Sequence, residues 1–167
     1  MTTPDDGDDG DDGALQVTAR GDREIVMTRT FRAPRSKVFE AYTTPRLLKR
    51  WFGVRDGWSW VACDLDLKVG GAYRYVWRRA DGRGLAVRGV NLDIVSPERL
   101  VTTESFDFPW YPGEAVQTLE LVEEDGRTRL TATMRYESRH ARDAVLASPM
   151  PYGVARSYAR LAELLAA

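Results

Sequence analysis

The chain has 167 residues, 43% of them hydrophobic, and a formal net charge of −1 at pH 7, which suits one domain with a full core. No apolar run approaches the roughly 20 residues of a membrane-spanning helix, and the acidic N-terminus lacks the hydrophobic segment of a secretory signal. A single cysteine, Cys63, and a single histidine, His140, exclude an internal disulfide and a His-based metal site, so we expect a cytoplasmic protein with no metal and no cofactor.

The N-terminus is an acidic repeat. Six aspartates fall within the first 13 residues, so the remainder has 24 basic against 19 acidic residues, a net charge of about +5. Repeated Asp-Asp-Gly cannot bury apolar area, which predicts a disordered acidic tail over residues 1–21, there for solubility or to shield a basic face. A single domain is expected over residues 22–167. Its basic residues are scattered rather than clustered, which argues against a nucleic-acid partner.

Strands and helices then follow in chain order. The β-branched segment 23–32 predicts a strand, residues 36–42 predict a helix, and Pro45 begins a second short helix. Six further strands are predicted at 58–67, 72–78, 84–95, 99–108, 115–123 and 128–136. After His140 the apolar residues recur at helical spacing, which predicts one long terminal helix. An antiparallel meander leaves one sheet face uncovered, and this helix is the element that can cover it.

Two Asp-Gly dipeptides, at residues 81–82 and 125–126, are the strongest hairpin signals in the chain. Interpreted as two-residue turns, they pair Trp77 with Ala86, Tyr75 with Arg88, Tyr73 with Val90, Leu119 with Ala132, and Gln117 with Met134. The other turns pair Leu92 with Thr102, Val90 with Glu104, Leu65 with Tyr73, Cys63 with Tyr75, and Val61 with Trp77. The mostly apolar members of the pairs then share one face, which supports these registers.

The face that carries Tyr73, Tyr75 and Trp77 is expected to turn toward the terminal helix. A charge on such an aromatic face must be paired, stacked or bound to a ligand. Three interpretations of Arg88 stay open: a buried pair with Glu104, a ligand anchor, or an incorrect register. The polar groups expected on this face are the tyrosine hydroxyls, Arg88, Glu104, Thr102, Gln117 and Cys63.

The other reactive side chains have simpler interpretations. Asp64 and Asp66 face outward in this register, with Asp64 opposite Arg74, which indicates a solvated ion pair rather than an acid–base pair. Cys63 is interpreted as a small core residue rather than a nucleophile, and His140 as part of a surface turn. No catalytic triad or metal site is recognisable.

One segment carries a family resemblance. Asp66, Lys68, Gly70, Gly71 and Tyr73 follow the pattern D-x-(K/R)-x-G-G-x-(Y/W). With APRSKVFEAYTTPRLLKRWFG before it and RGVNLDIVSPERLVTTESF after it, the chain resembles the SRPBCC (START-like) superfamily from about residue 23 to the C-terminus. The branch that it resembles is the one named after the activator of heat-shock-protein ATPase.

The resemblance implies a helix-grip fold of the α+β class. In it, a seven-stranded antiparallel sheet wraps around the long C-terminal helix and leaves an apolar cavity, with two short helices between strands 1 and 2. Such proteins often have Gly-Trp near the start of the last helix, where this chain has Gly153-Val154. A valine there removes a ring from the cavity side and predicts a larger or differently shaped pocket.

The leading hypothesis is a protein that binds a small hydrophobic molecule, aromatic or lipid-like, in that cavity. An alternative is an enzyme of the cyclase or dehydratase kind, with Glu104 as the acid or base and Arg88 stabilising negative charge. A third hypothesis is regulation of a chaperone or another partner protein, and an unpaired strand or the loop at residues 109–113 could form a homodimer contact. The expected ligand-binding residues are Tyr73, Tyr75, Trp77, Arg88, Glu104, Phe106, Gln117, Met134, Val154 and Tyr158.

Overall fold

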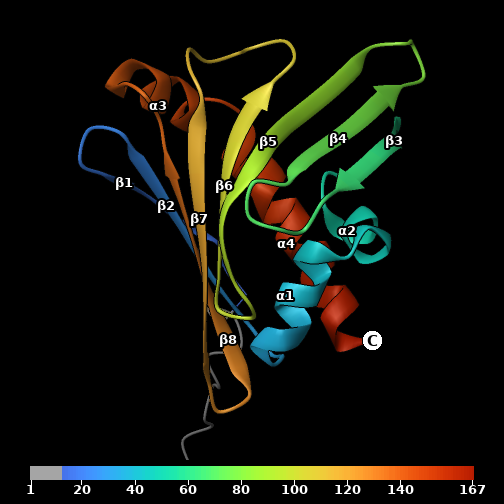
Figure 1. Cartoon of the computed structure of the whole chain (residues 1–167), viewed down its shortest axis with the longest axis vertical. Helices are drawn as coiled ribbons and strands as arrows, with labels where there is room; N and C mark the ends of the chain where they lie inside the picture. The colour runs from blue at the N-terminus through green and yellow to red at the C-terminus, as the bar shows by residue number, and fades with distance from the viewer. Residues whose placement is uncertain (1–12) are drawn as a thin grey trace, which may run out of the picture.

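The computed structural model describes residues 13–167, which form one antiparallel sheet of eight strands in the order β1-β2-β8-β7-β6-β5-β4-β3 (Figure 1). The strands are β1 (Gln16–Arg20), β2 (Glu24–Phe31), β3 (Trp58–Leu65), β4 (Ala72–Arg79), β5 (Gly84–Val95), β6 (Arg99–Phe106), β7 (Ala115–Glu124) and β8 (Arg127–Arg135). The helices are α1 (Arg35–Thr43), α2 (Pro45–Trp51), α3 (Arg139–Leu146) and α4 (Met150–Ala166). No helix among these residues is both long and apolar enough to cross a bilayer.

The expected α+β architecture is confirmed, but the sheet has eight strands rather than seven. The additional strand is β1, in a segment expected to belong to the acidic tail, and it pairs with β2. Residues 1–12, on which the rest of that expectation falls, lie outside the described residues. The two short helices therefore lie between the second and third strands.

The expected terminal helix is two helices, α3 and α4. The hydroxyl of Ser138 caps α3 by accepting a hydrogen bond from the backbone N–H of Ala141 at 3.0 Å. Pro149 lies between the two helices and Pro151 follows in the first turn of α4, because proline is tolerated at the start of a helix but interrupts a helix interior. In the first turn of α4 the missing proline N–H costs nothing, since that group would have no helical partner.

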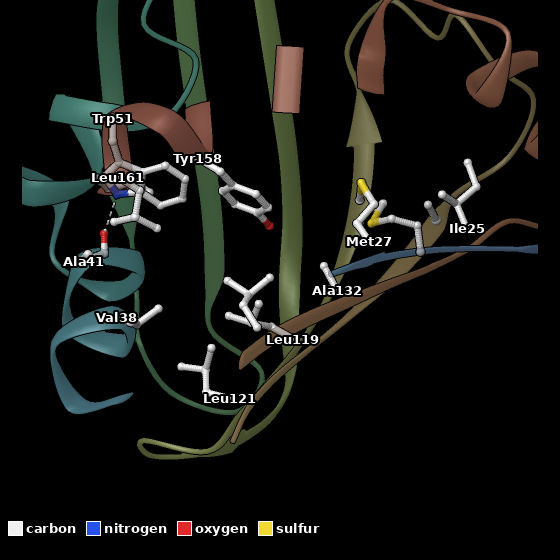
Figure 2. Close-up of a cluster of buried hydrophobic side chains, with 14 of the residues drawn as sticks. Ile25, Met27, Val38, Ala41, Trp51, Leu119, Leu121, Ala132, Tyr158 and Leu161 are labelled. Atoms are coloured by element: carbon white, nitrogen blue, oxygen red, sulfur yellow. Dashed lines mark hydrogen bonds between the residues drawn. The ribbon is translucent and has the colours of Figure 1, made fainter. Parts of the chain in front are cut away.

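The hydrophobic core lies between the concave face of the sheet and α4, with α1 and α2 beside that helix (Figure 1). Figure 2 shows its centre, where Tyr158 extends from α4 toward the sheet. Trp51 of α2 is fully buried, and its indole N–H donates to the carbonyl of Ala41 at 3.1 Å (Figure 2). This bond ties α1 to α2 and satisfies a polar group that burial would otherwise leave without water.

The hairpin between β7 and β8 has the expected register, with Leu119 opposite Ala132 and Gln117 opposite Met134. Its turn residues, Asp125 and Gly126, have φ of 53° and 74°, the signature of a two-residue type I′ turn.

The hairpin between β4 and β5 does not have the expected register. Trp77 lies opposite Leu85, Tyr75 opposite Val87, and Tyr73 opposite Gly89, one residue away from the predicted pairs. The turn is the reason. Residues 80–82 form a three-residue loop with Gly82 at φ 90°, the alternative in which the last loop residue is left-handed.

Two β-bulges cause the remaining differences. Between β5 and β6, Asp93 pairs with Val101 and Asn91 with Thr102, so the extra residue is Leu92. The predicted partners of Leu92 and Val90, Thr102 and Glu104, are therefore wrong. Between β3 and β4, the expected pairs Leu65–Tyr73 and Cys63–Tyr75 are confirmed. Trp77, however, lies opposite Trp60 rather than Val61, because the register shifts between Trp60 and Ala62.

Candidate functional site

A cavity of about 770 Å³ lies between the concave face of the sheet and α4. Of the described elements, all but β1 contribute residues to its lining. It reaches the surface beside Tyr152 and Trp110, which are both exposed. Well-packed protein interiors contain few voids larger than a water molecule, so a space of this size is a candidate binding cavity rather than a packing defect.

Three aromatic residues of β4 form one wall of the cavity: Tyr73, Tyr75 and Trp77. The inward orientation expected for them is correct. The rings of Tyr73 and Tyr75 lie 4.9 Å apart, and Phe52, just beyond α2, stacks on Tyr75 at 6.0 Å and on Trp77 at 5.7 Å. These rings line the cavity without filling it, so the wall is both rigid and open to a ligand.

The family-specific segment before β4 has a structural role. A Cβ on Gly71 would lie 2.2 Å from the carbonyl oxygen of Asp66, so only glycine fits this corner. The side-chain amide of Asn91 in β5 donates to the same carbonyl at 2.8 Å, and the backbone N–H of Gly70 donates to the carbonyl of Asn91. The segment therefore fixes where β4 begins and places the aromatic wall, of which its own Tyr73 is part.

Tyr73 crosses two strands. A Cβ on Gly89, opposite it in β5, would lie 2.6 Å from the Tyr73 ring, so the missing side chain lets the ring lie across β5. The Tyr73 hydroxyl then donates to the carbonyl oxygen of Thr103 in β6. Burial raises the pKa of this hydroxyl, with the nearby charge of Glu104 adding to the rise, so Tyr73 is a neutral hydrogen-bond donor.

Glu104 of β6 is the acidic group of the cavity lining. Its Oε1 accepts a hydrogen bond from the Tyr111 hydroxyl at 2.9 Å. Burial raises the pKa of the Glu104 carboxyl, and the bond from Tyr111 offsets part of that rise. No lysine, arginine or histidine among residues 13–167 forms an ion pair with Glu104.

Arg88, expected on the concave face, is on the convex face. The one-residue shift of β5 turns its side chain outward, where it is 61% exposed. Its Nη1 donates to Asp107 at 3.1 Å, and Arg74 donates to the other oxygen of the same carboxylate at 3.2 Å. The buried Arg88–Glu104 pair is therefore wrong, and so is a place for Arg88 in the cavity.

A tyrosine pair backs the cavity on the helical side. The Tyr42 hydroxyl of α1 donates to the Tyr158 hydroxyl of α4 at 2.8 Å. Burial raises the pKa of Tyr158 to about 12, so both phenols stay neutral at physiological pH. They hold α1 and α4 together without placing a charge in the cavity.

The other chemically interesting side chains lie away from the cavity. Cys63 is half-buried, and burial raises the pKa of its thiol, as expected of a core residue rather than a nucleophile. Asp64 lies opposite Arg74 in the predicted register, but Arg74 pairs with Asp107 instead. His140 is exposed in α3.

Nine of the ten predicted ligand-binding residues line the cavity; Arg88 does not. Sequence reasoning missed several aromatic residues. Tyr136 continues the inward alternation after Ala132 and Met134, so the spacing alone predicts it. Tyr111, in a loop considered for dimer contact, is buried and bonded to Glu104, and no periodic pattern marks it. The lining residues missed include Trp51, Phe52, Trp110 and Tyr136.

Comparisons with known proteins agree on the fold. The sequence profile of the family described as "Activator of Hsp90 ATPase homolog 1-like protein" matches residues 32–166. A crystal structure from Rhodobacter sphaeroides is 31% identical with a TM-score of 0.84, over 91% of this chain and 97% of that one. One from Mycobacterium smegmatis is 23% identical with a TM-score of 0.79, over 92% and 98%. One from Nitrosomonas europaea is 26% identical with a TM-score of 0.76, over 89% and 97%. No curated protein matches the sequence.

Proposed function

Since the chain belongs to the Activator of Hsp90 ATPase homolog 1-like family, a family of the SRPBCC type, we propose that it binds a small hydrophobic molecule between the sheet and α4. The observation that carries this proposal is the cavity of about 770 Å³. That volume lies within the roughly 300–1,000 Å³ typical of small-molecule sites. The lining has the matching chemistry, with many aromatic rings and few polar groups.

The lining is also prepared for a ligand. Three of its tyrosine hydroxyls are bonded within the protein, Tyr73 to a backbone carbonyl and Tyr42 to Tyr158, so an apolar guest leaves these three satisfied. The rings of β4 are held by one another and by Phe52. A ligand therefore meets a wall that loses little side-chain entropy on binding.

A cavity-filling variant tests the proposal. Val154 of α4 lines the cavity and is half-buried, whereas Ala159 on the same helix is exposed. We expect Val154→Trp to weaken binding of the neutral fluorescent probe N-phenylnaphthylamine by about tenfold or more, and Ala159→Trp to leave it unchanged. For the wild type, a neutral ligand at 100 times its Kd should stabilise the fold by about 2.7 kcal/mol. Equal probe binding by the two variants would contradict the proposal.

A second candidate function is acid–base catalysis in the same cavity, which one observation favours. The Glu104 carboxyl lines the cavity and burial raises its pKa, which favours a role as a general acid or base. Arg88 has no part in it, because it lies on the other face. The test is exchange of α-hydrogens for deuterium in methyl nonyl ketone in deuterated buffer, followed by NMR. Exchange in the wild type that is lost in Glu104→Gln supports catalysis; equal exchange with and without protein contradicts it.

Regulation of a chaperone, the third hypothesis, has the description of the matched family as its support. The cavity itself is formed by residues of this chain, within residues 13–167, and needs no partner protein to complete the described lining. Direct binding to a chaperone of the Hsp90 class, measured with and without the cavity-filling tryptophan, would separate the two roles.

A further inference from the structure

Among the described residues, the charge inside the cavity is negative. Of the described lining residues, Glu104 is the acidic one, and the basic ones, Arg55 and Arg156, are exposed to solvent. Each of the two arginines is placed over a ring, Arg55 over Trp58 at 4.5 Å and Arg156 over Tyr152 at 5.7 Å. The cavity therefore combines a carboxylate in its lining with two arginines on its solvent side.

The carboxylate of Glu104 is not compensated by the protein. Its one hydrogen-bond donor among the described side chains is the neutral Tyr111 hydroxyl at 2.9 Å, and no described cation pairs with it. A half-buried carboxylate with that little support is stabilised either by a proton or by a cation. A carboxylate or phosphate ligand placed beside it would add repulsion between like charges.

Aromatic rings surround the same group. Tyr111 packs edge-to-face against Tyr136 with centroids 5.2 Å apart and against Phe106 at 5.9 Å, and Phe106 contacts Trp110 at 5.7 Å. The negative faces of such rings attract organic cations, most strongly where water is excluded. Rings and carboxylate thus favour the same kind of ligand group.

We infer that the cavity selects an apolar molecule that carries a positively charged nitrogen, held by the Glu104 carboxylate and the rings of Phe106 and Tyr136, and that it discriminates against carboxylate amphiphiles. This inference rests on the proposed function and names the ligand class of that same site. The apolar part of the ligand lies along the aromatic wall of β4, and its charged nitrogen contacts Glu104.

Three probes with the same alkyl chain test the inference: decyltrimethylammonium, decanol and decanoate, each titrated below its micelle concentration and followed by calorimetry. We expect the cation to bind at least about tenfold more tightly than the alcohol, and decanoate to bind more weakly than the alcohol. In Glu104→Gln the cation should lose its advantage over decanol. Glu120→Gln is the matched control, because this exposed residue of β7 gives the same charge change away from the cavity.

The outcomes are distinguishable. If decanol binds and the cation binds no more tightly, or if Glu104→Gln keeps the preference, the inference is overturned and the proposed function stands. If none of the three probes binds, the inference and the proposed function both fall. The comparison of probes on the wild-type protein requires no variant, so it decides the question even if Glu104→Gln does not fold.

Discussion

Replacing Arg142 tests how α3 is attached to the turn between β1 and β2. Arg142 of α3 is 5% exposed, and its Nη1 donates to the carbonyls of Gly21 at 2.9 Å and Glu24 at 3.1 Å. These two carbonyls flank the β1–β2 turn. The next turn of α3 carries Val145, which lines the cavity. Arg142 thus connects the strand that sequence analysis missed to the binding site.

The expected cost follows from those bonds. A hydrogen bond from a charged group contributes about 1.5–3 kcal/mol, and Arg142→Met keeps the apolar stem while removing both bonds to carbonyls. Water reaches part of the vacated space, so we expect a loss of about 2–4 kcal/mol in the free energy of unfolding. For a domain of this size that corresponds to a decrease of roughly 5–15 °C in Tm.

Urea unfolding followed by tryptophan fluorescence and by circular dichroism measures this loss. The control is Arg139→Met in the same helix. Arg139 is 70% exposed, and its ion pairs with Asp22 and Asp143 are 3.9 and 3.7 Å long, so its removal should change stability by less than about 1 kcal/mol. If Arg142→Met is within about 0.5 kcal/mol of the wild type, the carbonyls are satisfied without the guanidinium and the reasoning is refuted.

Three further predictions concern the cavity. Burial raises the pKa of the Glu104 carboxyl, so the folded protein holds the carboxyl proton more tightly than the unfolded chain does. The free energy of unfolding should therefore fall as pH rises from the ordinary glutamate pKa through the raised one. If Glu104→Gln shows the same dependence of stability on pH as the wild type, this prediction is contradicted. Gly53→Ala should cost more than about 1 kcal/mol, because φ is 65° and the new Cβ would lie 2.8 Å from the Trp77 ring; unaltered stability and tryptophan emission would count against it. Gly153→Ala, in α4 with no atom within 4 Å of the new Cβ, should stabilise by about 0.5–1 kcal/mol in the same urea assay, and a loss would show that α4 needs glycine there.

Much of the fold could be predicted from the sequence. Most of the cavity lining could be predicted as well, although two pairing registers were wrong, because the two errors cancel. The three-residue loop at residues 80–82 shifts β5 by one residue against β4, and the bulge at Leu92 shifts β5 by one residue against β6. The two shifts cancel across β5. Glu104 and Phe106 therefore face inward as predicted, while β5 alone is inverted and takes Arg88 to the other face.

The sequence could not reveal the shift between β4 and β5, because the two Asp-Gly hairpins of the chain contain the same dipeptide. Asp125-Gly126 forms a two-residue turn, whereas Asp81-Gly82 lies within a three-residue loop. Local propensity permits either conformation, and the flanking strands decide between them through side-chain packing. The role of Tyr111 could not be predicted either, since its loop has no periodic pattern. Only the folded chain brings its hydroxyl to Glu104.

The family resemblance identified the fold more securely than the ligand for a physical reason. The segment that carries it, from Asp66 to Tyr73, builds a tight corner around Gly71 and Asn91. That corner sets where β4 begins, and of the residues in the pattern only Tyr73 lines the cavity. Residues such as Val154 and Trp110 shape the cavity and lie outside that segment.

The bulge in β3 has a consequence for self-association. Among the strands of residues 13–167, β3 is the last on its side of the sheet, so its outer backbone groups face no other described strand. A regular edge of this kind invites pairing with another chain and growth into ordered aggregates. The extra residue at Val61 interrupts the hydrogen-bond spacing in the middle of that edge. An incoming strand can match one half of the edge but not both, which protects the protein at high concentration without the need for a covering segment.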